Sequence, residues 1–436
     1  MNIRALCLYI NSKYMLLKQS RRSLVTCRAL PRLPGLGPHM APAFGTSLYG
    51  SALSVIESIV FREMTGTELV AMNKYTAVSA PIQNLAGSVE PACISASRRG
   101  RSVDMFATVA LGIGALATAS VWIISRSMSL DEDVRIYFCL RMCSLPTFTL
   151  YNTCTALLKY ERRLSDMLKV MVGAFCFYAG LLCLVTQCIG MDLVTLGVCQ
   201  SVSELFYLGI LLYASGIRPK LPDWPFVKEA VGGIALVASN NVSACAMSGL
   251  RATVARGLDT LDQAAHQLAL TLASCMSMFG KSWTIMSQCI LPTSLERSRD
   301  TVKIVVGIHA SSVILFVGVW ALCSHVPSLL TAIPEVQSIL QGGAWTLAAY
   351  LATHDAGRGL MGVLTALECF RDMFVVKSVA LGTLWVMLQT GPKTLEGAWM
   401  ALTVSAGVNY ALSLALVTKE VRFGAHEKNE KVHEDI

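Results

Sequence analysis

Charged residues are scarce in this chain, and their scarcity limits what it can be. Only 15% of the 436 residues are charged, whereas 54% are hydrophobic and the mean hydropathy is +0.54. An average soluble domain has about 25% charged residues. A water-soluble fold of this length cannot hide so much apolar surface, which excludes a soluble enzyme, a nucleic-acid-binding domain and a disordered protein. The net charge of +8 then fits a membrane protein, whose basic residues gather in the loops on one side.

Catalytic and metal-binding motifs are also lacking. The fifteen Cys residues form no CxxC pair, and Cys139 and Cys143, which share a helix face, have no further ligands at usable spacing. We expect the cysteines to be small buried hydrophobes, and so many free thiols favour a reducing compartment. No Walker A, HExxH or GxSxG motif occurs in a supporting context. The sequence therefore predicts no enzyme and no cofactor, and transport driven by ATP would need another chain.

No acidic residue precedes Glu57, although the first forty residues are rich in basic ones. Those basic residues are Arg4, Lys13, Lys18, Arg21, Arg22, Arg28 and Arg32. A basic, acid-free and amphipathic N-terminus is typical of organelle transit peptides. The alternative is a basic tail that flanks the first helix. Residues 31–42 are rich in Pro and Gly and predict a linker into the domain that follows.

Twelve long apolar segments occupy most of the remaining chain. A transmembrane helix needs about 20 apolar residues, which predicts spans at 41–61, 69–96, 103–125, 134–158, 168–190, 193–215, 226–254, 262–292, 302–330, 343–367, 373–390 and 396–418. The predicted fold class is an all-α membrane protein with twelve transmembrane helices. Its predicted parts are a basic N-terminal extension (1–40), two pseudo-symmetric six-helix bundles (41–216 and 217–418) and a charged C-terminal tail (419–436).

The basic residues of the connections test this number of spans. We number each connection by the span that precedes it. The even-numbered connections carry 15 Lys and Arg residues, among them Lys159 and Arg162 between the fourth and fifth spans, whereas the odd-numbered connections carry 5. The second group is Arg62, Arg126, Arg135, Arg256 and Lys393. Because positive residues gather on one side of a membrane, this alternation favours twelve helices with both termini on the basic side.

Nine charged residues fall inside the predicted spans. They are Glu57, Lys74, Glu90, Arg141, Glu204, Arg251, Lys281, Asp355 and Arg358. A charge at the centre of the bilayer costs about 3 kcal/mol on insertion scales, and it usually marks a path for substrate or ions. So many charges are typical of a transporter with a water-filled central cleft and make little sense in a passive scaffold.

Two pairs of similar segments indicate an internal repeat. Residues 66–73, after the first span, resemble residues 259–266, after the seventh, at an offset of 193. The run Thr-Ala-Leu occurs at 155–157 and again at 365–367, an offset of 210. Six spans per repeat make the halves parallel, and transport sites in such folds lie between the halves near the midplane of the membrane.

Two of these segments also carry a resemblance to a known family. Residues 259–267 read Asp-Thr-Leu-Asp-Gln-Ala-Ala-His-Gln, and Ser287-Gln288-Cys289 follows one helix later. Residues 66–71, Gly-Thr-Glu-Leu-Val-Ala, form the matching loop of the first half. Over residues 42–418 the chain resembles the MATE (multidrug and toxic compound extrusion) family. With its basic extension it looks most like the DinF-type branch found in plastids.

The resemblance implies a fold, a function and a set of partners. Family members form two six-helix bundles around a cavity, and they export small organic molecules, xenobiotics among them, as antiporters driven by a proton or sodium gradient. They place an acid in the first helix, which Glu57 matches here, and protonation of that acid is the expected coupling event. In the plastid-type branch a Glu tends to stand midway along the eighth helix, where this sequence has Lys281. The implied partners are a small organic substrate, H⁺ or Na⁺, and the lipid bilayer. The chain is expected to be a monomer in the chloroplast envelope or another organelle membrane, without nucleic acid.

Cationic residues are expected to line the transport path of the second half. His354 and Arg358 share a face of the tenth helix at i and i+4. With Asp355, Lys281 and Arg141 of the equivalent fourth helix, they are the candidate pathway residues beside Glu57. An excess of cations in a low-dielectric cleft favours organic anions as substrates. The alternatives are structural ion pairs, Asp355 with Arg358 and Lys281 with an acid.

Other interpretations stay open at this point. His266 fits either a family position or a packed helix start. An alternative function is a flippase for lipid-linked intermediates, from the superfamily related to MATE transporters. A third is a membrane-embedded enzyme, although its possible ligands His309, His325 and His354 fall on different helices without a spacing motif.

Overall fold

The computed structural model describes residues 39–47, 85–127, 132–188, 192–255, 276–294, 296–331, 333–391 and 394–434, together with residue 82 and a few residues between 258 and 272. The chain divides into two units, Met1–Pro38 and His39–Ile436, and every described residue belongs to the second. The predicted transit segment, apart from its last two residues, and the predicted coupling acid Glu57 lie outside the described residues.

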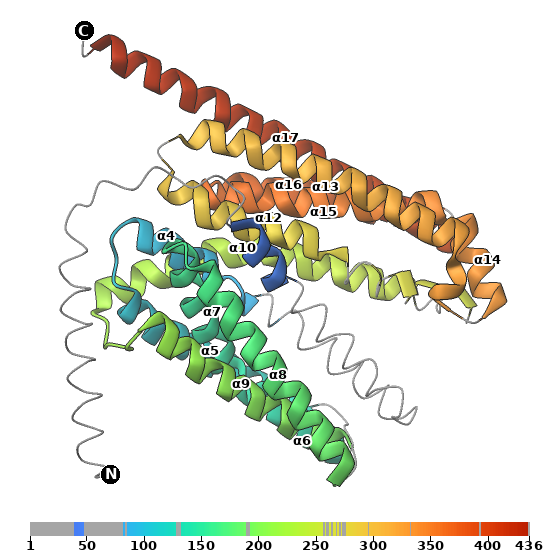
Figure 1. Cartoon of the computed structure of the whole chain (residues 1–436), viewed down its shortest axis with the longest axis horizontal. Coiled ribbons are helices and arrows are strands. Elements are labelled where there is room, and N and C mark those ends of the chain that lie inside the picture. Colours follow the sequence, from blue (N-terminus) through green and yellow to red (C-terminus); the bar gives the residue numbers. More distant parts are fainter. Residues whose placement is uncertain are drawn as a thin grey trace. The chain divides into compact units, whose positions relative to one another are not determined.

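Helices are the only regular secondary structure in the part of the chain that the structure describes (Figure 1). The first half contains α4 (Val89–Arg98), α5 (Val103–Ser127), α6 (Glu132–Cys143), α7 (Leu145–Tyr160), α8 (Leu164–Cys188) and α9 (Leu193–Ser215). The second half contains α10 (Trp224–Ala255), α12 (Met278–Ile290), α13 (Arg297–His325), α14 (Pro334–Gly342), α15 (Ala344–Ala366), α16 (Phe370–Thr390) and α17 (Leu395–Glu434), with the short 3-10 helices η1 (Leu291–Thr293) and η2 (Pro327–Leu329).

These helices follow the predicted spans, and their surfaces are those of a membrane protein. Among the described residues six helices are long and apolar enough to cross a membrane, namely α5, α8, α9, α13, α16 and α17. Their outward faces carry apolar side chains such as Leu116 and Ile314, which are 70% and 66% exposed, whereas the ionisable Lys159 and Asp355 are buried. Apolar side chains outside and charged side chains inside suit a lipid solvent.

One predicted span is interrupted and another begins directly after a turn, and particular residues explain both features. The fourth span consists of α6 and α7, and Pro146 lies in the first turn of α7. At that position its missing N–H removes no helical hydrogen bond, whereas an uninterrupted helix would lose one. At the start of the tenth span the chain turns between α14 and α15 at Gly343, where a Cβ atom would lie 2.2 Å from Cζ3 of Trp399. A side chain at position 343 would therefore displace the Trp399 indole.

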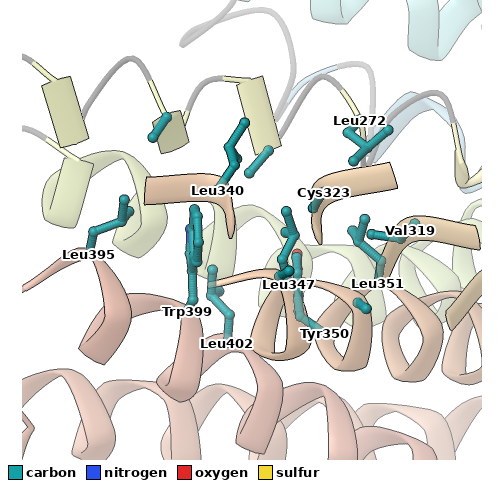
Figure 2. Packing of buried hydrophobic residues seen from close by; sticks show 14 of the residues in the cluster. Leu272, Val319, Cys323, Leu340, Leu347, Tyr350, Leu351, Leu395, Trp399 and Leu402 are labelled. Atoms are coloured by element: carbon teal, nitrogen blue, oxygen red, sulfur yellow. The ribbon is translucent and has the colours of Figure 1, made fainter. Parts of the chain in front are cut away.

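The core of the second half gathers around α15. Figure 2 shows Leu347 and Leu351 of α15 packed with Cys323 of α13 and with Trp399 and Leu402 of α17. In a bilayer the hydrophobic effect gives helices little reason to associate, so close van der Waals packing holds them together. α15 contacts α12, α13 and α17 and is thus the central helix of this half.

The two halves share a structural repeat that is visible at the ends of α7 and α15. Arg162 and Glu368, which follow these helices with positive φ angles of 60° and 63°, are 206 positions apart. In each turn the next residue donates its N–H to the carbonyl five positions back, at 2.7 Å and 2.9 Å. The offset of 210 predicted from the runs at 155–157 and 365–367 is therefore wrong by four residues, about one helical turn. A match of three common residues can slide by one turn without changing its helix face.

Candidate functional site

Three of the predicted pathway residues meet between α12 and α15. Asp355 of α15 is buried, and its Oδ1 atom accepts a hydrogen bond of 2.8 Å from the backbone N–H of Gly280 on α12. The cations Lys281 of α12 and Arg358 of α15 both interact electrostatically with this carboxylate. We call Gly280, Lys281, Asp355 and Arg358 the second-half cluster. Its side chains carry two formal positive charges and one negative charge.

Two glycines allow α12 and α15 to approach this closely. A Cβ atom on Gly280 would lie 2.5 Å from the backbone O of Asp355, and one on Gly362 would lie 2.5 Å from Cα of Thr284. At the same contact Thr284 Oγ1 donates a hydrogen bond of 3.2 Å to the backbone O of Arg358. Small residues commonly bring membrane helices together in this way. Here the close contact fixes the position of the Asp355 carboxylate.

Arg358 is the accessible member of the second-half cluster. It is exposed, although residues 355–357 and 359–364 on either side of it along α15 are buried. His354 lies one turn earlier on the same face, half-buried, with its ring centroid 5.6 Å from that of Tyr350. α15 thus presents a cation and an imidazole on a part of its surface that the neighbouring helices leave open.

Arg141 does not join this cluster. It lies on α6 in the first half, where its Nη1 atom donates a hydrogen bond of 2.6 Å to Oε1 of Glu204 on α9. Aligning the turns after α7 and α15 pairs each residue of the first half with the residue 206 positions later, and we call this pairing the 206-residue register. In it Arg358 corresponds to Asn152. That Arg141 lines the transport path together with Arg358 stays a prediction.

His266 is buried against the core of the second half. Nε1 of Trp399 donates a hydrogen bond of 3.2 Å to its Nδ1 atom, and only 3% of the residue is exposed. This contact favours the packing role over a role in the transport path.

A second group of buried polar residues joins the two halves. Lys159 of α7 forms an ion pair with Glu90 of α4, and its Nζ atom also donates a hydrogen bond of 3.2 Å to Oε1 of Gln288 on α12. Thr155, one turn before Lys159, donates a hydrogen bond of 3.3 Å to Oε2 of Glu90. The side chains of Lys159 and Glu90 are 6% and 18% exposed. We call Glu90, Thr155, Lys159 and Gln288 the inter-half cluster.

Sequence reasoning placed Lys159 in a connection and so missed this cluster. The residue belongs to the last turn of α7 and is buried, so one of the predicted loop cations is not in a loop. The signal that points to it is Glu90, because a carboxylate inside an apolar helix needs a partner. Thr155 and Lys159, at i and i+4, share a helix face that can supply one.

Partly exposed ion pairs also connect the halves. Arg98 Nη1 lies 3.8 Å from Glu368 Oε1, and Arg101 Nη2 lies 2.7 Å from Glu229 Oε2. Each such pair contributes about 0–1 kcal/mol, because water competes for both charges. The buried inter-half cluster is therefore the more consequential polar contact between the halves.

The cysteines whose side chains the structure describes are free, and their surroundings differ. Cys93, Cys154, Cys289 and Cys323 are buried, as predicted for small hydrophobes, whereas others such as Cys183 are exposed on the helical surface. Within the described ranges, no group of three or more His, Cys, Asp or Glu residues is placed to hold a metal ion.

Taken together, these features define a class of protein: a helical membrane protein built from two related halves that meet at buried polar residues. No family model and no curated protein matches the sequence. Solved structures do match the fold. A crystal structure of MATE in the straight conformation has a TM-score of 0.74 at 13% identity and covers 89% of this chain and 95% of its own.

Two further solved structures agree with this match. The eukaryotic MATE transporter AtDTX14 has a TM-score of 0.71 at 14% identity, with 90% of this chain and 98% of that one covered. A MOP superfamily transporter from Pyrococcus furiosus has a TM-score of 0.70 at 13% identity, with 89% and 95% covered. The chain therefore has the fold of MATE transporters, with twelve transmembrane helices in two bundles, and the predicted fold class is confirmed. At these identities the likeness is one of fold.

Proposed function

We propose that this chain is a secondary active transporter, an antiporter that exports small organic molecules, and organic anions in particular, in exchange for H⁺ or Na⁺. Solved structures that share its fold are described as MATE transporters, one of them as a multidrug resistance transporter. The observation that carries the proposal is the second-half cluster. Charged side chains within the spans of a membrane protein usually mark a path for substrate or ions.

The sign of the charge in this cluster favours an anionic substrate. Lys281 and Arg358 both interact with the single carboxylate of Asp355, and Arg358 is exposed. Electrostatic attraction is stronger in a low-dielectric site than in water, and a guanidinium can hold a carboxylate through two parallel hydrogen bonds. One solved neighbour, the transporter from Pyrococcus furiosus, is described as having a binding pocket of reverse polarity, which supports variation of the pocket charge on this fold.

Efflux from proteoliposomes tests the proposal. The purified full chain would be offered aromatic carboxylates and organic cations under imposed pH and sodium gradients. We expect gradient-driven movement of the carboxylates, and loss of this preference in Lys281→Glu, which reverses the charge beside Asp355. Lys169→Glu makes the same reversal at an exposed position of α8 and should keep the preference of the parent. Vesicles of the parent that favour cations, or that move no organic solute under either gradient, would refute the proposal.

We also propose that residues 1–40 direct a monomeric chain to an organelle membrane, with the plastid envelope as the first choice. The support is the basic, acid-free composition of this segment, which is typical of transit peptides. A fluorescent protein fused to residues 1–40 should be imported into plastids of plant cells. A fusion that stays in the cytosol would contradict this localisation.

A further inference from the structure

We propose that the inter-half cluster is a gate latch. In this arrangement Lys159 of the first half holds Gln288 of the second half, and release of that contact lets the halves separate on the basic side of the membrane. The inference rests on the proposed transport function, because a transporter with a site between its halves must open to each side in turn.

The position of the cluster along the helices suits a gate. Lys159 is the last but one residue of α7, and Gln288 lies two residues before the end of α12. Both helices lead into even-numbered connections, which carry most of the loop cations. Asp355, by contrast, is hydrogen-bonded to Gly280, which lies eight residues before Gln288 on α12, about 12 Å deeper along that helix. The inter-half cluster therefore stands between the second-half cluster and the basic side.

The ion pair of the inter-half cluster lies within one half, so the halves can separate without leaving a buried charge unpaired. The ion pair of Lys159 and Glu90 lies wholly within the first half, and Thr155 supports it. The contact from Lys159 to the second half is one hydrogen bond to the neutral amide of Gln288. Separating a buried ion pair is strongly destabilising, whereas one hydrogen bond to a charged group is a modest cost. Such a division suits a contact that forms and breaks in every cycle.

Other polar contacts between the halves reinforce the closed arrangement. Nδ2 of Asn241 on α10 donates a hydrogen bond of 2.9 Å to Oγ of Ser88, which precedes α4. Arg162, after α7, reaches the backbone O of Ile290 at 3.5 Å. These contacts join the same pair of halves, so separation of the halves must break them together with the contact of Gln288.

A buried thiol beside the latch provides the readout. Cys289 follows Gln288 and has no exposed surface, and Cys323, in the core of the second half, is equally buried. A membrane-impermeant maleimide applied to the basic side, followed by mass spectrometry of the peptides, would measure the labelling of both thiols in the full chain. We expect Gln288→Ala to speed the labelling of Cys289 about tenfold, because the closed state loses a hydrogen bond to a charged group. The labelling of Cys323 should not change.

Gln200→Ala is the matched control. Gln200 is 6% exposed and Gln288 is 4% exposed, but Gln200 accepts a hydrogen bond from Tyr137 inside the first half. Removing its amide should leave the labelling rate of Cys289 at the parent value.

A double variant removes the latch in a second way. Glu90→Gln together with Lys159→Met eliminates both charges at once, so that no buried ion is left without its partner. This variant should also expose Cys289 and leave Cys323 protected.

The outcomes separate the latch from the proposed function. Equal labelling of Cys289 in Gln288→Ala and Gln200→Ala would overturn the latch. Faster labelling of Cys323 together with Cys289 would also overturn it, because the whole second half would then have loosened. Selective exposure of Cys289 in a chain that moves no organic solute would refute the proposed function and leave the latch standing.

Discussion

Replacing Gly280 with Ala tests how the second-half cluster is held together. The new Cβ atom would lie 2.5 Å from the backbone O of Asp355 and 2.7 Å from its Oδ1 atom. Neither atom can move away easily, because one belongs to the backbone of α15 and the other accepts the N–H of Gly280 itself. Ordinary contacts between non-bonded atoms begin at about 3.5 Å. The two helices must therefore separate by roughly 1 Å or Asp355 must turn out of its place.

The expected change in the free energy of unfolding of Gly280→Ala is the balance of two opposing effects. Overpacking of a tight contact typically costs about 1–3 kcal/mol, whereas Ala is favoured over Gly inside a helix by about 1 kcal/mol. Gly382 of α16 measures the helix preference of Ala over Gly alone, because a Cβ atom there would meet nothing within 4 Å. Gly382→Ala should therefore stabilise the protein by about 0.5–1 kcal/mol. The difference between the two variants, about 1–3 kcal/mol, measures the overlap alone.

Thermal unfolding of the purified variants in one detergent provides the assay. We expect the midpoint of Gly280→Ala to lie below that of Gly382→Ala, and Gly382→Ala to match or exceed the parent. Gly280→Ala should also lose gradient-driven transport, because the Asp355 carboxylate that interacts with Lys281 and Arg358 no longer holds its position. A midpoint for Gly280→Ala at or above that of Gly382→Ala would show that α12 and α15 are not in tight contact, and the argument for a fixed carboxylate would fail.

The remaining predictions concern a helix cap, the coupling acid and the topology. Asp192 Oδ1 accepts the N–H of Thr195 at 2.6 Å at the start of α9, and hydrogen bonds from the side chain and the backbone N–H of Thr195 lower the pKa of Asp192 below its usual 3.8. Asp192→Ala should therefore lower the free energy of unfolding by about 0.5–2 kcal/mol above pH 4. Thermal unfolding should show that the parent loses this extra stability as the pH falls through the lowered pKa of Asp192. Glu57→Gln should abolish the pH dependence of gradient-driven efflux, because an amide keeps the shape but does not titrate, and an unchanged pH profile would remove Glu57 from the mechanism. Tags at the two termini should be accessible from the same side of the membrane, and accessibility from opposite sides would contradict twelve spans.

The helices could be predicted from the sequence because a bilayer imposes their length and polarity. Apolar runs of the required length, bounded by charged connections, mark α5, α8 and α16 without any knowledge of their neighbours. The close packing at Gly343, where the chain turns between α14 and α15, could not be predicted in this way. It depends on the ring of Trp399, which is 56 positions further along the chain, and hydropathy carries no information about that contact.

The candidate site could be predicted in part, for a related reason. Lys281, Asp355 and Arg358 attract attention because a charge inside a span is unusual. Their mutual arrangement depends on the hydrogen bond from the backbone of Gly280, which no pattern of residue types reveals. Lys159 was missed because it lies one residue before the end of its helix. At such a position hydropathy cannot separate a buried cation from one in a loop.

The structural repeat shows that the charged site breaks the symmetry of the two halves. In the 206-residue register Asp355 and Arg358 correspond to Thr149 and Asn152 of α7. Thr149 donates its hydroxyl hydrogen bond to the backbone O of Pro146 within its own helix. The first half therefore places uncharged residues where the second half places its cluster, and a symmetric substrate site on the axis between the halves is not expected.

The inter-half cluster breaks the same symmetry in the opposite direction. Lys159 corresponds in the register to Thr365, whose hydroxyl donates a hydrogen bond of 2.8 Å to the backbone O of Met361 inside α15. A cation stands only in the half where Glu90 neutralises it, and it reaches across to Gln288 in the other half. The first half thus supplies the charged residues of the inter-half cluster, and the second half supplies those of the second-half cluster. Because each cluster belongs to a packed bundle, a movement of one half relative to the other changes the gate and the access to the site together, as alternating access requires.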